Sequence, residues 1–69
     1  MITKLVVDGV LYIVSIWKYD NQSRRTAKVY DPRQSTPEKV LEEIETNVFL
    51  DQEYNKKYIL TPLGMSPVL

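Results

Sequence analysis

Residues 5–30 read LVVDGVLYIVSIWKYDNQSRRTAKVY, three apolar or aromatic segments separated by two turn signals. The first signal, Asp8-Gly9, favours a two-residue type I′ turn, because both central residues of that turn need a positive φ. The second turn either has its tip at Asn21-Gln22 or is a four-residue loop over 20–23. This pattern predicts a three-stranded antiparallel meander with strands over residues 2–7, 10–19 and 24–30.

The two turns also fix the register of the meander. The first turn pairs Val7 with Val10, and both forms of the second turn pair Tyr19 with Arg24. Paired residues share a face and neighbours alternate between faces, so two faces follow. The core face is nearly all apolar and consists of Leu5, Val7, Val10, Tyr12, Val14, Ile16, Ala27 and Val29. The second face mixes aliphatic, aromatic and basic side chains: Ile2, Lys4, Val6, Leu11, Ile13, Ser15, Trp17, Tyr19, Arg24, Thr26, Lys28 and Tyr30.

The region after the meander has the signals of one helix that ends near Asn47. Ser35 with Glu38 three residues later fits a capping box, and Thr36 before Pro37 also fits a helix start. After these start signals, four apolar residues recur at helical spacing: Val40, Leu41, Ile44 and Val48. Because this stripe suits the core face of the meander, we expect the helix to cover that face. Four side chains should then be nearly fully buried together: Val14, Ile16, Leu41 and Ile44.

The remaining residues add a short strand at 57–61, which Pro62 ends, and a turn at Gly64. Residues 65–69 form an apolar C-terminal tail, which either folds back on the domain or lies against another chain. The expected fold is therefore α+β: a three- to four-stranded antiparallel β-meander with one amphipathic helix packed on one face. The order is β-β-β-α-β, in a single domain over residues 1–64.

The composition narrows the class of protein. Nine basic and nine acidic residues give a formal net charge of zero, whereas a general nucleic-acid binder usually has a basic excess. There is no cysteine, so no disulfide supports the small core, and no apolar run is long enough to span a membrane. We expect a cytoplasmic protein with no membrane association.

Catalytic chemistry has few side chains to use in this sequence. There is no histidine and no cysteine, which excludes the common catalytic triads and dyads and the usual zinc sites. The helix carboxylates lie opposite its apolar stripe, where we expect them to be solvated. The only glycines, Gly9 and Gly64, lack the spacing of a phosphate-binding loop. We therefore predict a protein that is not an enzyme, with no cofactor and no metal.

The second face is the candidate binding site. Its aromatic and basic residues resemble those enriched in interface hot spots, and its aliphatic residues suit burial against a partner. We predict partner contacts through Leu11, Ile13, Trp17, Tyr19, Arg24, Lys28 and Tyr30.

Three uses of this face are open. The leading one is a protein interface, either with another protein or in a homo-oligomer. An alternative is nucleotide or single-stranded nucleic-acid binding, with bases stacked on the aromatic rings. In the third, the C-terminal segment packs over the face. The small size and the lack of catalytic groups suit a regulatory protein, such as a phage or bacterial inhibitor or adaptor.

Overall fold

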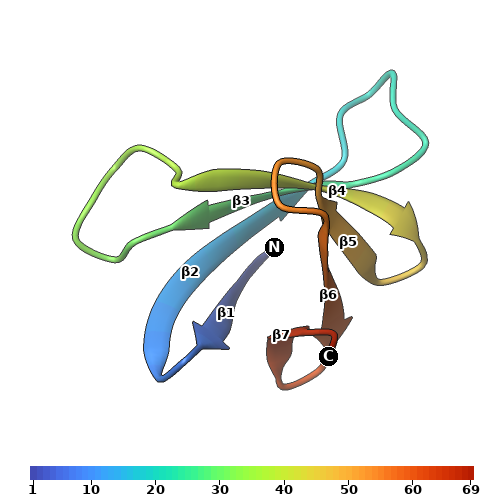
Figure 1. Cartoon of the computed structure of the whole chain (residues 1–69). Helices are drawn as coiled ribbons and strands as arrows, with labels where there is room; N and C mark the ends of the chain where they lie inside the picture. Colours follow the sequence, from blue (N-terminus) through green and yellow to red (C-terminus); the bar gives the residue numbers. More distant parts are fainter.

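The computed structural model describes all 69 residues, and it contains seven strands and no helix. The strands are β1 (Ile2–Val7), β2 (Val10–Trp17), β3 (Thr26–Tyr30), β4 (Lys39–Glu45), β5 (Val48–Asp51), β6 (Lys56–Thr61) and β7 (Gly64–Pro67). Each strand pairs antiparallel with the next, and β7 returns to lie parallel to β1, which closes a barrel (Figure 1). The predicted α+β fold with one helix and a three- to four-stranded sheet is therefore wrong, because the chain is an all-β barrel.

The meander over β1, β2 and β3 has the predicted register. Val7 pairs with Val10 and Leu5 with Tyr12. The turn residues Asp8 and Gly9 have φ values of 51° and 77°, as a type I′ turn requires. In the second hairpin the predicted pairs hold from Ile13–Tyr30 to Trp17–Thr26. The strands end there, so residues 18–25 form a longer loop than predicted.

Strand β4 occupies most of the region in which a helix was predicted. Side chains alternate along it: Leu41 is fully buried, whereas Val40 before it is 47% exposed. Lys39 and Glu43 lie on the same side of the strand as Leu41, because side-chain direction repeats every two residues. Their charges interrupt the apolar alternation that identifies a strand, and the remaining apolar residues fall by coincidence at helical spacing.

The signals read as helix ends belong to loops and turns. Ser35 and Thr36 lie in the exposed β3–β4 connection. Asn47, with φ of 64°, belongs to the two-residue turn that separates Glu45 from its partner Val48. A register shift between Glu43 and Glu45 marks a bulge just before that turn.

The C-terminal segment completes the barrel. The strand predicted at 57–61 is β6, which runs from Lys56 to Thr61. Gly64, with φ of 136°, begins β7 and lies so close to β1 that an added Cβ would be 3.0 Å from the carbonyl oxygen of Lys4. The next residue, Met65, is buried and pairs with both Leu60 and Leu5. Residues 65–67, which were predicted to belong to a tail, thus form the strand that joins the two ends of the sheet.

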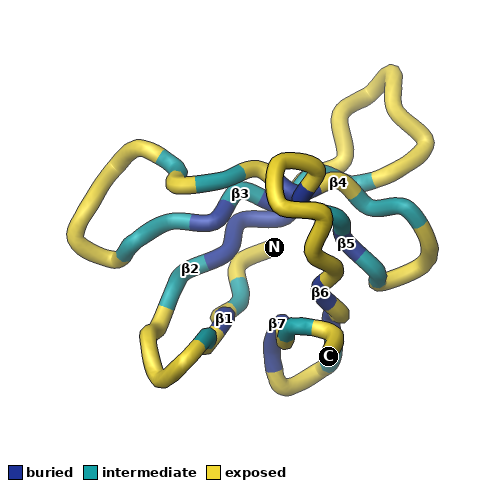
Figure 2. Tube along the Cα trace, viewed as in Figure 1, coloured by how far each residue is buried: buried dark blue, intermediate teal, exposed yellow.

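Every strand of the barrel contributes at least one buried residue to the core (Figure 2). It consists of ten buried residues: Leu5, Val14, Ile16, Ala27, Val29, Leu41, Phe49, Tyr58, Leu60 and Met65. Five of the predicted core-face residues are among them, and Val7 and Tyr12 pack against the cluster. Val10 is half exposed, and Ile44 is only partly buried because it lies beside the β4 bulge. The structure contains no helix of the length and apolarity that a membrane crossing requires.

Candidate functional site

Most of the predicted site residues lie together on the outside of the barrel, across β1 to β4. Strand pairing sets them in rows, of which Lys4–Ile13–Tyr30 is one. We name this surface the outer face and define it by Ile2, Lys4, Val6, Leu11, Ile13, Ser15, Trp17, Thr26, Lys28, Tyr30, Val40 and Glu42. Leu11, Ile13, Trp17, Lys28 and Tyr30 of the predicted site belong to it.

Tyr19 and Arg24, also predicted for the site, are not paired on the sheet. Both lie in the β2–β3 loop, where the carbonyl oxygen of Tyr19 accepts a hydrogen bond from the backbone of Gln22 at 3.0 Å. Arg24 lines a polar groove beside Glu42, and no apolar side chain contributes to that groove. These two side chains therefore lie outside the paired rows, although Thr26 and Glu42 of the outer face also line the groove beside Arg24.

Large side chains on the outer face are exposed although the core is complete without them. Ile2 is 65% exposed, Trp17 55%, Val6 48% and Leu11 47%. Trp17 also has a fixed position, because its indole Nε1 donates a hydrogen bond to Ser15 Oγ two residues earlier on the same side of β2. Nothing from the C-terminal segment covers β2 and β3, since β7 lies between β6 and β1. This face is free to contact another molecule.

One end of the barrel is closed by an ion pair between β4 and the β2–β3 loop. Arg25 Nη2 lies 2.7 Å from Glu43 Oε2, and Arg25 Nε and its backbone N–H both donate to Oε1. Glu43 Oε2 also accepts the backbone N–H of Asn47 at 2.9 Å. The guanidinium lies 5.5 Å from the centre of the Phe49 ring. The hydrogen bonds from Arg25 lower the pKa of Glu43 to about 2.

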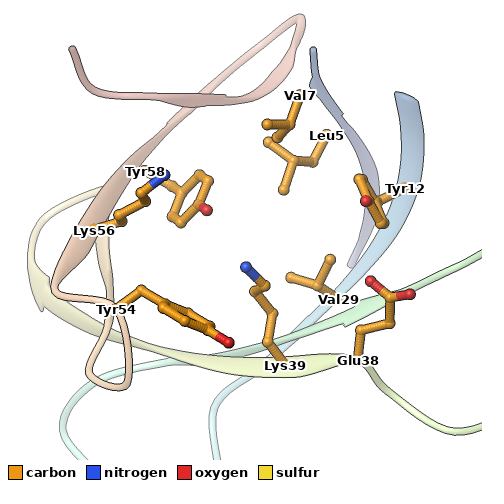
Figure 3. Close-up of a pocket in the computed structure, with 9 residues that line it drawn as sticks. All are labelled: Leu5, Val7, Tyr12, Val29, Glu38, Lys39, Tyr54, Lys56 and Tyr58. Atoms are coloured by element: carbon orange, nitrogen blue, oxygen red, sulfur yellow. The ribbon is translucent and has the colours of Figure 1, made fainter. Parts of the chain in front are cut away.

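The other end of the barrel holds a cavity of about 270 Å³ (Figure 3). Leu5, Val7 and Val29 form its aliphatic walls. Three tyrosines, two lysines and one carboxylate complete the lining: Tyr12, Tyr54, Tyr58, Lys39, Lys56 and Glu38. The lining comes from five strands and from the β3–β4 and β5–β6 connections, so only the closed barrel brings these residues together.

Lys39 is the central charged residue at the end of the barrel that holds the cavity. Its Nζ lies 3.3 Å from Oδ2 of the buried Asp51, and Oδ2 accepts no hydrogen bond. The ammonium also lies 5.5 Å from the Tyr54 ring centre and 6.0 Å from that of Tyr58. Burial disfavours the Lys39 charge, but Asp51 and Tyr58 outweigh burial, so the pKa of Lys39 is raised above 10.5.

The sequence did not predict the charged residues of this cavity. Lys39 fell within the predicted helix, and Asp51 and Tyr54 fell between that helix and the strand predicted at 57–61. Reading 39–43 as a strand would have placed Lys39 and Glu43 beside Leu41 inside the fold. Their ion-pair partners could not follow from that reading, because they come from other strands and loops.

The structure has an exposed outer face with large side chains and a cavity at one barrel end, and no group of three or more His, Cys, Asp or Glu side chains could hold a metal ion. Comparisons with known proteins found no family model, no curated protein and no solved structure that matches this chain.

Proposed function

We propose that this chain is a non-enzymatic binding protein that acts through protein contacts of its outer face, and that its first partner is a second copy of itself. The observation that carries the proposal is the set of paired rows of exposed large side chains outside a complete core. Trp17, Leu11 and Val6 contribute nothing to that core, so their exposure is best explained by a partner that covers them.

The chemistry of the outer face favours protein over nucleic acid. Trp and Tyr are frequent interface anchors, and Trp17 and Tyr30 both lie on this face. The aliphatic Ile13 is paired with Tyr30, and Leu11 follows on the same side of β2. Aliphatic side chains bury well against a protein surface, but they give phosphates nothing to bind. The net charge of zero also supplies no general attraction for a polyanion.

Two properties support a second copy as the partner. Two molecules of zero net charge do not repel each other at long range. The outer face also carries both signs, with Lys4 and Lys28 on β1 and β3 and Glu42 on β4, so a copy that is turned over can place acid opposite base. In addition, a ten-residue core is small, and small domains commonly gain stability from oligomerisation.

A regulatory role, as an inhibitor or adaptor, belongs to the same proposal. It is supported by the combination of a binding face with a lack of histidine and cysteine. A cytoplasmic location is also proposed, because a chain without cysteine uses no disulfides.

The test is sedimentation equilibrium of the 8.1 kDa chain from micromolar to near-millimolar concentration. We expect a monomer–dimer equilibrium, and Trp17→Ala should weaken it by roughly 30-fold or more, since hot-spot truncations cost about 2 kcal/mol. Added salt should have little effect on the wild-type equilibrium. Ile59→Ala is the matched control, because Ile59 is 40% exposed but lies on β6, which β5 and β7 separate from the strands of the outer face.

A wild-type chain that stays monomeric throughout this range would overturn self-association. The nucleic-acid alternative has its own signature: a monomer that binds single-stranded oligonucleotides with steep salt dependence, lost in Trp17→Ala. That result would replace the protein-binding proposal.

A further inference from the structure

The cavity at the open end of the barrel is a second site, separate from the outer face. Its aliphatic wall is formed by Leu5, Val7 and Val29, and side chains from β4 and β6 point into the space that this wall encloses (Figure 3). With about 270 Å³ of open volume, it lies just below the roughly 300–1,000 Å³ of typical small-molecule sites, so it suits a small ligand.

Lys39 is an unusual residue for its place in the barrel. Its pairing partner across the sheet is Val29, which in turn pairs with Val14, so an apolar side chain would continue this buried row. Instead, the chain places an ammonium there and buries Asp51 behind it. Burying an ion pair is often no more stabilising than packing apolar residues in its place. Stability alone therefore does not account for this lysine.

The donors of Lys39 are only partly used. An ammonium has three N–H donors, and in this chain its one close anionic contact is Asp51 Oδ2 at 3.3 Å. In Figure 3 the amine points to the middle of the cavity. The amine of Lys56 enters from β6 beside the Tyr58 ring.

These groups set the chemistry that the cavity accepts. The raised pKa of Lys39 keeps the amine charged at neutral pH, so it acts as a fixed cation and not as a nucleophile. Asp51 is already engaged by Lys39 and by the backbone N–H groups of Glu53 and Tyr54. A cationic ligand would meet two amines, with Glu38 as the one carboxylate in the lining. An anionic group would instead find Lys39 at the middle of the cavity and Lys56 at its edge, with phenol hydroxyls as further donors.

We propose that this cavity binds a small organic monoanion, a carboxylate with an apolar or aromatic body, whose charged group contacts Lys39 and Lys56 and whose body packs on the aliphatic wall. The site is independent of the proposed self-association. It lies inside the barrel end, whereas Trp17 projects from the outside of β2.

The test uses three matched one-ring probes that differ in charge: benzoate, benzamide and benzamidine. Binding is followed by NMR titration of the amide and tyrosine ring signals. We expect benzoate to shift signals of the cavity tyrosines and to bind roughly tenfold or more tighter than benzamide, as a charge-assisted contact implies. Benzamidine should bind most weakly. Equal binding of benzoate and benzamide, a preference for benzamidine, or no binding of any probe would overturn the proposal.

Two variants locate the anion contact. Lys56→Met removes an exposed amine and should lower benzoate affinity several-fold, whereas Lys57→Met, the control one residue along β6 and outside the cavity lining, should not. The double variant Lys39→Met with Asp51→Asn removes the central cation without leaving a buried carboxylate unpaired. It should lose most of the preference for benzoate over benzamide, and Lys56 should supply what remains. Benzoate affinity that is unchanged in both cavity variants would contradict the assignment. Trp17→Ala should keep the preference for benzoate, which separates this test from that of self-association.

Discussion

Both ends of the barrel contain an inward-facing charged residue of β4, but the two residues differ in how many hydrogen bonds they make. Strand β4 turns a charged residue inward near each end, Lys39 at its start and Glu43 toward its end, with Leu41 buried between them. Glu43 is saturated by the side chain and backbone of Arg25 and the backbone of Asn47. Lys39 has an ion-pair partner, Asp51, but its amine faces an open cavity. An inward-facing charge that already makes all its hydrogen bonds can close its end of the barrel. One with unused hydrogen bonds can instead contact a ligand.

Substitutions at the closed end of the barrel, where Arg25 pairs with Glu43, should have the larger effect on stability. Glu43→Gln removes the charge that accepts hydrogen bonds from Arg25, and breaking one partner of such a pair should lower the free energy of unfolding by about 2–3 kcal/mol at pH 7. Urea denaturation measures the difference. Glu45→Gln is the control, because Glu45 is an exposed neighbour on the same strand and should cost less than about 0.5 kcal/mol.

The pH dependence of that difference has a defined sign. The pKa of Glu43 falls from 4.5 to about 2 in the folded chain, chiefly through the Arg25 side chain. A depressed folded pKa stabilises the protein fully above the unfolded value and loses this contribution as pH falls through the folded value. The gap between wild type and Glu43→Gln should therefore be constant above roughly pH 5 and shrink between there and pH 2. A gap that widens in acid would show that the closed end is held by something else.

The open end of the barrel, which holds the cavity, should lose little stability when the charges of Lys39 and Asp51 are both removed. In the double variant Lys39→Met with Asp51→Asn, the asparagine oxygen can still accept the backbone N–H groups of Glu53 and Tyr54. Because both charges leave together, unfolding free energy should change by less than about 1 kcal/mol. The matched variant of the other end, Arg25→Met with Glu43→Gln, should cost clearly more, since the Asn47 contact of Arg25 is also lost. Equal costs at both ends would remove the distinction drawn between them.

The sequence predicted the first three strands and their register because Asp8-Gly9 specifies its own turn and the flanking residues alternate cleanly. The prediction was wrong at residues 37–47, and the cause is the pair of inward-facing charges at the two ends of the barrel. The inward charges of Lys39 and Glu43 obscure the alternation of apolar and polar residues that identifies a strand. Pro37 then resembles the start of a helix, and Asn47 resembles its end. The partners that make those charges acceptable, Arg25 and Asp51, are distant in sequence.

For the candidate site, alternation placed Leu11, Ile13, Trp17, Lys28 and Tyr30 on one face, where the structure also has them. It extended that face too far, because the strands stop at Trp17 and Thr26 and leave Tyr19 and Arg24 in a loop. The cavity was beyond sequence reasoning, since closure through β7 is needed to bring its lining together.

Both barrel ends and one edge of the outer face depend on β4 being a strand with Lys39, Leu41 and Glu43 facing inward. Backbone NMR tests this directly. We expect extended-type chemical shifts over 39–45 and cross-strand NOEs for the pairs Thr26–Glu42 and Lys28–Val40. Helical shifts over residues 37–47, with sequential amide NOEs in place of those cross-strand contacts, would contradict it.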